Sequence, residues 1–298
     1  MVIPRAVILR YRLPLTVPED NPPRLRVDKA VHTWKEGEGI LIDDAFKHEV
    51  DAGAVLITGG SRGIGAAVAR RLGRLGRSIC ISYRVDAESA RAVVAEVTAS
   101  GGDAIAVQAD MARPDDTERL FLTVDTELGP LTGLVNNVGI LEKQCRVDEM
   151  DAERLQRIMS TNVVGPFLCA AQAVRRMSTL HGGTGGAIVN VSSAASRLGS
   201  PGEYVDYAAS KGAMDTLTIG LAREVAGEGI RVNAVRPGFI DTDIHASGGD
   251  PGRVARFAPS LPMKRGGRPA EVAEAIVWLL SEEASYVTGS FLDLAGGR

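Results

Sequence analysis

The sequence predicts an α/β fold in which helices cover both faces of a parallel sheet. From residue 53 onward, short apolar runs alternate with longer stretches in which apolar residues recur at helical spacing. This alternation is typical of βαβ units, whose strands are parallel and whose crossovers are right-handed. A glycine-rich turn after the first apolar run supports this interpretation, because doubly wound sheets bind ligands at such turns. We therefore expect one doubly wound domain over residues 53–298.

The expected elements follow one another in alternation. Apolar runs predict strands at residues 54–57, 78–82, 104–107, 133–135, 187–191, 230–235 and 291–293. Amphipathic stretches predict helices at residues 64–72 and 87–99, between 107 and 133, at 151–180, around Tyr207, and at 270–281.

Residues 1–52 differ from the rest of the chain. No period of a strand or helix persists there, and prolines interrupt any helix, at Pro4, Pro14, Pro18, Pro22 and Pro23. We expect an N-terminal extension that is poorly ordered or laid on the surface, or that reflects a start codon assigned too far upstream. The alternative is a functional arm that covers the active site or a neighbouring subunit.

Composition limits the classes of function. The 298 residues are 45% hydrophobic and 24% charged, which suits a globular domain, and the net charge of −3 without a basic run favours neither nucleic acid nor an anionic membrane. Cys80, Cys145 and Cys169 lack the spacing of a disulfide framework or a zinc site, so we expect no metal and a reducing, cytoplasmic location. No apolar run approaches the roughly 18 residues of a membrane span.

The turn after the first strand reads Thr58-Gly59-Gly60-Ser61-Arg62-Gly63-Ile64-Gly65. Glycines allow positive φ and a close backbone approach, and the free N–H groups at the start of the next helix attract phosphate. A strand before the turn and a helix after it are the context that a dinucleotide-binding turn requires. We predict dinucleotide binding here; a purely structural turn is the alternative.

The end of the second strand indicates which dinucleotide binds. An acidic residue that bonds the ribose 2′-hydroxyl is usual there, but the chain reads Ser82-Tyr83-Arg84. Arg62 lies within the glycine turn, so two guanidinium groups could flank a 2′-phosphate. We predict NADP in preference to NAD; the alternative is that both arginines are solvated surface charges.

Polar residues also follow the third and fourth strands, at the carboxyl ends where open α/β sheets bind ligands. Asp110 could accept a hydrogen bond from an adenine amino group, or it could begin a helix-capping turn before Pro114. Asn136-Asn137-Val138-Gly139 would ordinarily be interpreted as a simple turn, and only its position suggests a role.

The long helix predicted at 151–180 contains a polar residue, Asn162, within its apolar stripe. Pro166, four residues later, has no N–H, so the carbonyl of Asn162 loses its helical partner and a kink is expected. A freed carbonyl beside a buried amide could hold a water molecule. The alternative is a buried asparagine whose side chain is satisfied by neighbouring backbone.

Tyr207 and Lys211 are spaced i, i+4, which on a helix brings their Cβ atoms within about 5–6 Å of each other on one face. A nearby cation favours the phenolate, so the pair could act as an acid–base device. Ser192 and Ser193 end the preceding strand. The residues around the pair are small, which suggests a helix shared with a partner subunit: Ala208, Ala209, Ser210, Gly212 and Ala213.

Beyond the sixth strand, Pro237-Gly238 leads into a segment rich in glycine and proline that ends near Pro269. We expect this segment to close over the ligand crevice. His245 is more simply interpreted as a solvated loop histidine. The candidate lining residues are Phe239, Ile244, His245, Phe257 and Met263.

In this order, the motifs resemble those of the short-chain dehydrogenase/reductase family, in its glucose 1-dehydrogenase-like or 3-oxoacyl-carrier-protein-reductase-like branch. The resemblance covers residues 53–298 and implies a Rossmann sheet of strand order 3-2-1-4-5-6-7, NAD(P)-dependent oxidoreduction, and a homotetramer or homodimer. Two departures are Val138, where alanine is commoner, and Ser193, which lies 14 residues before Tyr207, one more than is common. The motifs are Thr58-Gly59-x-x-x-Gly63-x-Gly65, Asp110, Asn136-Asn137-x-Gly139, Asn162, Ser193, Tyr207-x-x-x-Lys211 and Pro237-Gly238.

The resemblance also implies roles for single residues. Tyr207 would donate or accept the proton, Lys211 would hold the nicotinamide ribose and lower the tyrosine pKa, Ser193 would bind the substrate oxygen, with Ser192 as the fallback, and Asn162 would hold a relay water. The residues expected at the cofactor are Gly59, Ser61, Arg62, Gly63, Ile64, Gly65, Tyr83, Arg84, Asp110, Asn137, Gly139, Tyr207, Lys211, Pro237, Gly238, Ile240 and Thr242.

We therefore expect an NADP(H)-dependent oxidoreductase that acts on a small carbonyl compound or secondary alcohol. A non-catalytic NADP-binding regulator would lack Tyr207, Lys211 or Ser193, and a sugar-nucleotide epimerase would have another glycine spacing. A 3-oxoacyl-carrier substrate would need a basic surface near the cleft, and a sugar or polyol would need polar side chains within residues 239–268.

Overall fold

The computed structural model describes residues 9–12, 24–27, 30–33, 40–43, 48–50 and 53–298. The chain divides into two compact units, residues 1–52 and 53–298. In the first unit, β1 (Leu9–Arg12) pairs with β4 (Ile40–Asp43), and β2 (Arg24–Val27) pairs with β3 (Ala30–Thr33) and β5 (His48–Val50), all antiparallel. The expectation of a poorly ordered or surface-laid extension stays a prediction, and much of it falls outside the described residues.

The second unit contains a parallel sheet of seven strands in the order β12-β11-β10-β9-β6-β7-β8. Counted from the first strand of this unit, the order is 3-2-1-4-5-6-7, which confirms the predicted Rossmann topology. The chain leaves β6 in one direction through β7 and returns to its other side at β9, so a crevice is expected at the carboxyl ends of β6 and β9. The strands are β6 (Ala54–Ile57), β7 (Ser78–Tyr83), β8 (Asp103–Gln108), β9 (Leu131–Asn136), β10 (Gly186–Val191), β11 (Ile230–Pro237) and β12 (Phe291–Leu294).

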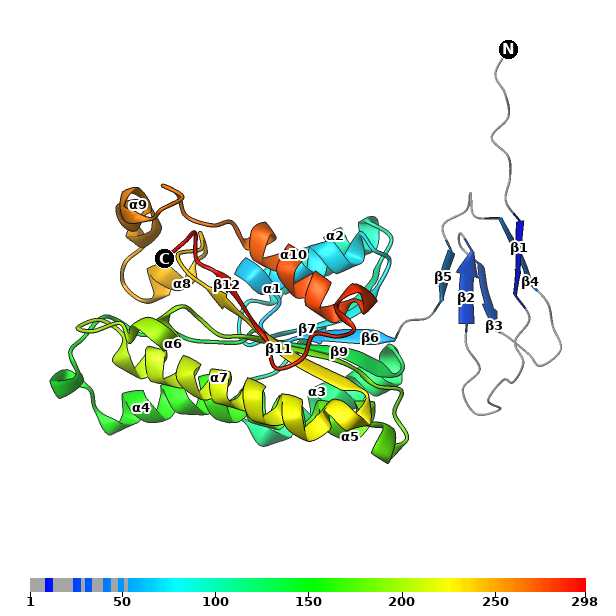
Figure 1. Cartoon of the computed structure of the whole chain (residues 1–298), viewed down its shortest axis with the longest axis horizontal. Coiled ribbons are helices and arrows are strands. Elements are labelled where there is room, and N and C mark those ends of the chain that lie inside the picture. The colour runs from blue at the N-terminus through cyan, green and yellow to red at the C-terminus, as the bar shows by residue number, and fades with distance from the viewer. Residues whose placement is uncertain (1–8, 13–23, 28–29, 34–39, 44–47, 51–52) are drawn as a thin grey trace, which may run out of the picture. The chain divides into compact units, whose positions relative to one another are not determined.

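Helices cover both faces of the sheet (Figure 1). Alternate residues of β6 point to opposite faces: Val55 and Ile57 join one buried cluster, and Ala54 and Leu56 join the other. One face carries α1 (Gly63–Gly73), α2 (Ala87–Ala99) and α10 (Pro269–Leu280), and the other carries α3 (Pro114–Glu127), α4 (Ala152–Met159), α5 (Gly165–Met177) and α7 (Val205–Val225). The short helices are α6 (Ala195–Leu198), α8 (Ile244–Ser247) and α9 (Arg253–Phe257).

The helix predicted at 151–180 is not continuous. Between α4 and α5 the chain makes a π-helical turn at Ser160–Val164, in which Gly165 N donates to the carbonyl of Ser160 five residues back. Pro166 follows this turn within the same helical run, so its missing N–H leaves a carbonyl of the preceding turn without that helical partner. The expected kink is therefore a local widening of the helix, and Asn162 lies in the middle of it.

Candidate active site

The glycine turn between β6 and α1 has the backbone geometry that its sequence predicts. Gly59 and Gly63 have φ of +65° and +55°, in the left-handed region that favours glycine. A Cβ on Gly65 would lie 2.6 Å from both the amide nitrogen of Asn137 and the carbonyl oxygen of Gly59. The residue before α1, Arg62, makes no side-chain capping bond, so the first N–H groups of α1 are free for an anion.

Asn137 holds this turn in place. Its Nδ2 donates to the carbonyl oxygens of Thr58 at 2.8 Å and Gly59 at 3.0 Å. The backbone N–H groups of Asn137 and Val138 donate to the Thr58 hydroxyl at 3.0 and 3.1 Å. Both amide hydrogens of Asn137 are therefore used within the protein, so this residue shapes the cofactor cradle instead of reaching out from it.

The residues predicted to contact a 2′-phosphate line one end of a large cavity at the carboxyl edge of the sheet. Arg62 and Arg84 are exposed, and neither guanidinium has an ion pair or hydrogen bond within the described residues. The nearest acid along the chain, Asp86, is engaged as the cap of α2, where it accepts from Ser89 N at 2.9 Å. Two unpaired guanidinium groups at this end suit an anionic ligand.

Asp110 fits both of its predicted interpretations. One carboxylate oxygen accepts from Ala112 N at 3.0 Å, which makes the local turn that precedes α3. The residue also lines the cavity, beside the end of β8. Capping and ligand contact are therefore compatible at this position.

Asn162 lies behind the cavity wall, fully buried. Its Oδ1 accepts from Ile140 N at 2.8 Å, and its Nδ2 donates to Ile140 O at 3.0 Å and to Ser210 Oγ at 3.1 Å. The side chain is thus satisfied, as the alternative interpretation of this buried asparagine expects. It ties the loop after β9 to α7, and any bond to a water would fall to its backbone.

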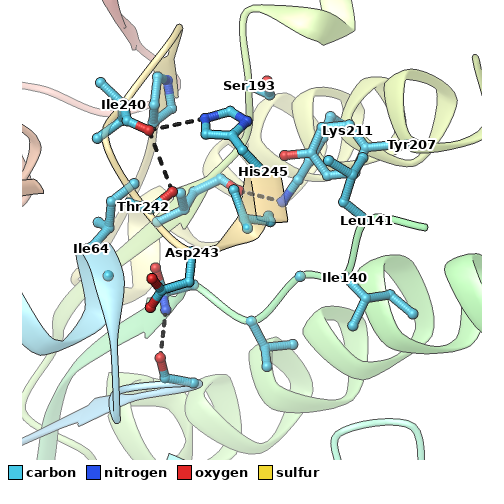
Figure 2. A pocket seen from close by; sticks show the side chains of 18 of the residues that line it. Ile64, Ile140, Leu141, Ser193, Tyr207, Lys211, Ile240, Thr242, Asp243 and His245 are labelled. Atoms are coloured by element: carbon cyan, nitrogen blue, oxygen red, sulfur yellow. Dashed lines mark hydrogen bonds between the residues drawn. The ribbon is translucent and has the colours of Figure 1, made fainter. Parts of the chain in front are cut away.

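Tyr207 and Lys211 lie in the first two turns of α7 and face the cavity (Figure 2). Lys211 Nζ donates to Val191 O at 2.7 Å and lies 5.6 Å from the centre of the Tyr207 ring. Burial lowers the pKa of Lys211 to about 8, against an opposing effect of Asp215. Burial raises the pKa of Tyr207 to about 12, and its hydrogen bond with Ser193 opposes the rise.

The expectation that Lys211 lowers the tyrosine pKa stays a prediction. In the protein alone, the largest influence on the pKa of Tyr207 is the loss of hydration, which raises it. The phenol therefore starts as a proton donor. A positive charge brought into the cavity would favour its ionisation.

The two serines at the end of β10 have different hydrogen-bond partners. Ser192 is buried, and its hydroxyl donates to Asp215 Oδ1 at 2.6 Å. Ser193 lines the cavity and bonds to Tyr207. The geometry favours Ser193 as the serine that meets a substrate.

An ion pair that the sequence analysis missed anchors the start of α7. Arg154 Nε donates to Asp206 Oδ2 at 2.7 Å, and Arg154 Nη1 donates to Lys143 O at 2.7 Å. Asp206 Oδ1 also accepts from the backbone N–H of Tyr207 at 2.9 Å. The only sequence signal was an acid in the first turn of a helix, which usually reflects no more than capping.

These residues surround one cavity of about 890 Å³. All the predicted site residues line it except Gly65 and Asn162, which lie behind its wall. His245, expected to be solvated, also lines it, and its Nε2 lies 3.0 Å from the carbonyl oxygen of Ile240 (Figure 2). Met263 does not line the cavity. Sequence reasoning missed Leu141, Tyr204 and Arg253, which line it from segments without a recognisable motif.

The part of the chain that the structure describes contains no cluster of three or more histidine, cysteine or acidic side chains suited to a metal ion. Within the same residues, no helix has the length and apolar character needed to cross a membrane.

Comparison with known proteins identifies the family. A family model described as Enoyl-(Acyl carrier protein) reductase matches residues 59–298. A solved short chain dehydrogenase from Burkholderia cenocepacia J2315, in complex with NADP, is 33% identical with a TM-score of 0.75, and the match covers 82% of this chain and 96% of that one. The chain belongs to the short-chain dehydrogenase/reductase family of oxidoreductases.

Curated relatives within this family differ in what their names describe. The Uncharacterized oxidoreductase YgfF of Escherichia coli (strain K12) is 58% identical over 243 residues, covering 82% of this chain and 98% of the relative. The 3beta-hydroxysteroid dehydrogenase 1 of Eggerthella lenta is 40% identical over 244 residues, which cover 82% of this chain and 92% of the relative. A second family model, Aspartyl/Asparaginyl beta-hydroxylase, matches residues 4–54, so the N-terminal extension resembles part of an unrelated family.

Proposed function

We propose that this protein transfers hydride between NADP(H) and the carbonyl carbon of a small ketone or the matching secondary alcohol, with Tyr207 as the acid–base residue. The observation that carries the proposal is the meeting of a phosphate-binding turn and the Ser193, Tyr207 and Lys211 side chains in one cavity. A non-catalytic binding protein would have no need of a buried tyrosine and lysine at a cofactor-sized cavity.

The cradle fits the cofactor on grounds of its own structure. A Cβ on Gly65 would collide with Asn137 and the Gly59 carbonyl, so this position requires glycine. The first N–H groups of α1 are free to bind a phosphate, and the guanidinium groups of Arg62 and Arg84 line the cavity at the end proposed for the ribose. NADPH, when bound, supplies the hydride. The solved relative from Burkholderia cenocepacia, which is in complex with NADP, supports the same choice of cofactor.

The protein's own residues carry out the proton chemistry. Ser193 donates a hydrogen bond to the substrate carbonyl oxygen, which orients and polarises the carbonyl. Tyr207, protonated in the buried site, gives its phenolic proton to the oxygen as negative charge develops there. Lys211, whose Nζ donates to Val191 O, would bond the cofactor ribose and stabilise the phenolate that remains. In alcohol oxidation these steps reverse.

Replacing Tyr207 by phenylalanine tests the proposal. We expect turnover to fall by about 100- to 10,000-fold, because general acid–base catalysis contributes about 10²–10⁴-fold. NADPH binding, followed by quenching of protein fluorescence, should persist. Tyr286→Phe is the control, because Tyr286 is fully exposed on the surface and does not line the cavity. Full activity in Tyr207→Phe would end the proposal.

Cofactor preference has its own test. Arg84→Ala should lower kcat/KM for NADPH by about 10- to 100-fold and leave that for NADH nearly unchanged, because charge-assisted hydrogen bonds to phosphate contribute about 1.5–3 kcal/mol. Arg91→Ala, on the exposed side of α2 and away from the cavity, is the control. An equal loss with both cofactors would contradict NADP recognition by Arg84. A homotetramer or homodimer stays a prediction, which light scattering would check.

A further inference from the structure

We propose that the substrate is a free ketone with an apolar, ring-shaped body, and neither a polyol nor a thioester on an acidic carrier. This inference rests on the function proposed above and adds the class of substrate. It concerns the part of the cavity beyond Tyr207 and Ser193, which we call the substrate wall. The substrate wall comprises Leu141, Tyr204, Phe239, Ile244 and Phe257, all of which line the cavity.

Two aromatic rings of the substrate wall form a rigid apolar pair. The rings of Phe239 and Phe257 are stacked, with centroids 4.6 Å apart and planes inclined by 12°. The guanidinium of Arg253 lies 5.5 and 5.1 Å from the two centroids, and that of Arg298 lies 5.0 and 5.9 Å from them. Guanidinium groups so close to both centroids lie beside the stacked pair and restrict its movement. A rigid apolar pair suits a saturated or aromatic ring more than a flexible polar chain.

Several polar groups beside this aromatic pair are engaged within the protein. The Tyr204 hydroxyl donates to Gly248 O at 3.1 Å, and Arg253 Nη1 donates to Glu203 Oε1 at 3.0 Å. His245 Nε2 bonds the carbonyl of Ile240, and its Nδ1 is buried out of reach of solvent.

This pairing decides against a polyol. A carbonyl accepts only, so the Nε2 of His245 must carry the proton, and the ring offers no further donor while it is neutral. Within the described residues, the Ser200 hydroxyl and the Arg298 guanidinium line this part of the cavity without a hydrogen-bond partner, but these two groups cannot pair with all the hydroxyls that a polyol would bury. Each unpaired hydroxyl would lose its bonds to water without replacement. An apolar body meets no such cost.

Charge near the cavity argues against an acidic carrier. Three arginines beside the substrate wall and its neighbouring loops are already paired with acids: Arg253 with Glu203, Arg256 with Asp250, and Arg197 with Asp293. Arg298 lines the cavity without an ion pair within the described residues, so it contributes a single uncompensated charge. Paired cations attract a polyanionic partner weakly, because their field is compensated nearby. The substrate is therefore expected to arrive alone.

The test compares three ketone substrates with the full chain and NADPH: 2-decalone, which is apolar and bicyclic; erythrulose, a polyhydroxy ketone; and the acetoacetyl thioester of N-acetylcysteamine. Loss of absorbance of the reduced nicotinamide gives kcat/KM for each. We expect 2-decalone to exceed both others by at least about tenfold, since burying apolar carbon contributes about 0.8 kcal/mol for each CH₂ group. A higher kcat/KM for erythrulose or for the thioester would overturn the substrate class.

Variants test the substrate wall itself. Leu141→Ala should raise KM for 2-decalone about tenfold and leave KM for NADPH unchanged, because Leu141 lies on the substrate side (Figure 2). Leu122→Ala makes the same truncation at an exposed position of α3 outside the cavity and should change neither constant. Phe257→Ala is a second wall variant in case Leu141→Ala, at a buried site, is too unstable to assay. Wall variants with unchanged KM for 2-decalone would overturn the assignment.

Failure of the proposed function would look different. If none of the three ketones consumed NADPH, and Tyr207→Phe matched the parent protein in every assay, the hydride-transfer proposal itself would be wrong. If a polar ketone were reduced by the parent protein and not by Tyr207→Phe, the function would stand and only the apolar substrate class would be rejected.

Discussion

Replacing Arg154 by methionine should lower both the stability of the protein and its turnover, because Arg154 compensates the Asp206 charge at the start of α7. The Asp206 side chain is fully buried, and it accepts from the backbone N–H of Tyr207 while it is paired with Arg154. Without the guanidinium, a buried carboxylate would remain with one weak donor.

The expected loss of stability follows from this burial. Removing one partner of a buried ion pair costs about 3–5 kcal/mol, because the remaining charge stays uncompensated. For a domain of this size we expect Tm to fall by roughly 10 °C. The first turn of α7 would shift to relieve the charge, and a displacement of about 1 Å at a reacting group lowers the rate about 100-fold.

The assay measures Tm, kcat and KM for NADPH in parallel. Arg154→Met should lower Tm and kcat and leave KM for NADPH within about twofold of its original value, because the cofactor cradle lies on other elements. Arg157→Met is the matched control, one turn along on α4. Arg157 pairs with Glu142 but is half exposed, so its loss should cost no more than about 1 kcal/mol.

A double variant separates stability from positioning. Arg154→Met with Asp206→Leu removes both charges, so stability should partly recover, because apolar replacements of buried pairs are often neutral. Turnover should stay low, since Asp206→Leu removes the carboxylate that accepts from the backbone N–H of Tyr207. If Arg154→Met behaved like Arg157→Met, or if the double variant regained full kcat, the positioning role would be refuted.

Two further predictions concern burial and backbone space. The pKa of Lys211 is lowered by burial to about 8, so the unfolded chain keeps this proton to higher pH, and the native state should gain about 2 kcal/mol between pH 8 and pH 10. Urea midpoints should show this gain in the parent protein and not in Lys211→Met; parallel curves would contradict it. Gly65→Ala should lower Tm and weaken NADPH binding, because its Cβ would meet Asn137 and the Gly59 carbonyl, whereas Gly220→Ala, with open space around it in α7, should leave both intact. If Gly65→Ala and Gly220→Ala had the same Tm and the same affinity for NADPH, the glycine turn could accommodate a Cβ and the prediction would be wrong.

The strands and most helices could be predicted because their signal is local. The apolar run at 54–57 matches β6, and the stretch at 87–99 matches α2, since period and flanking turn residues lie within the element itself. The glycine turn, Ser193 and the Tyr207 pair were found for the same reason. Because each of them follows a predicted parallel strand, the sequence predicted that they meet at the carboxyl edge of the sheet.

Partners distant in sequence could not be predicted. Asn137 bonds residues 78 and 79 positions earlier, and Arg154 meets an acid 52 positions later. Nothing in the local pattern shows that these side chains are used up inside the protein. The rise in the pKa of Tyr207 that burial causes could not be predicted for a related reason, because the loss of hydration depends on surrounding atoms from several elements.

The two ends of the cavity come from different stretches of chain. The cofactor end is made by the turn after β6 and the ends of β7, β8 and β9, and much of the substrate wall comes from the loops and short helices after β11. In evolutionary terms, a copy of this gene can change residues such as Phe239 or Phe257 and acquire a new ligand while the cofactor end is inherited intact. A single scaffold can in this way give rise to enzymes that share a cofactor and differ in the molecules they reduce.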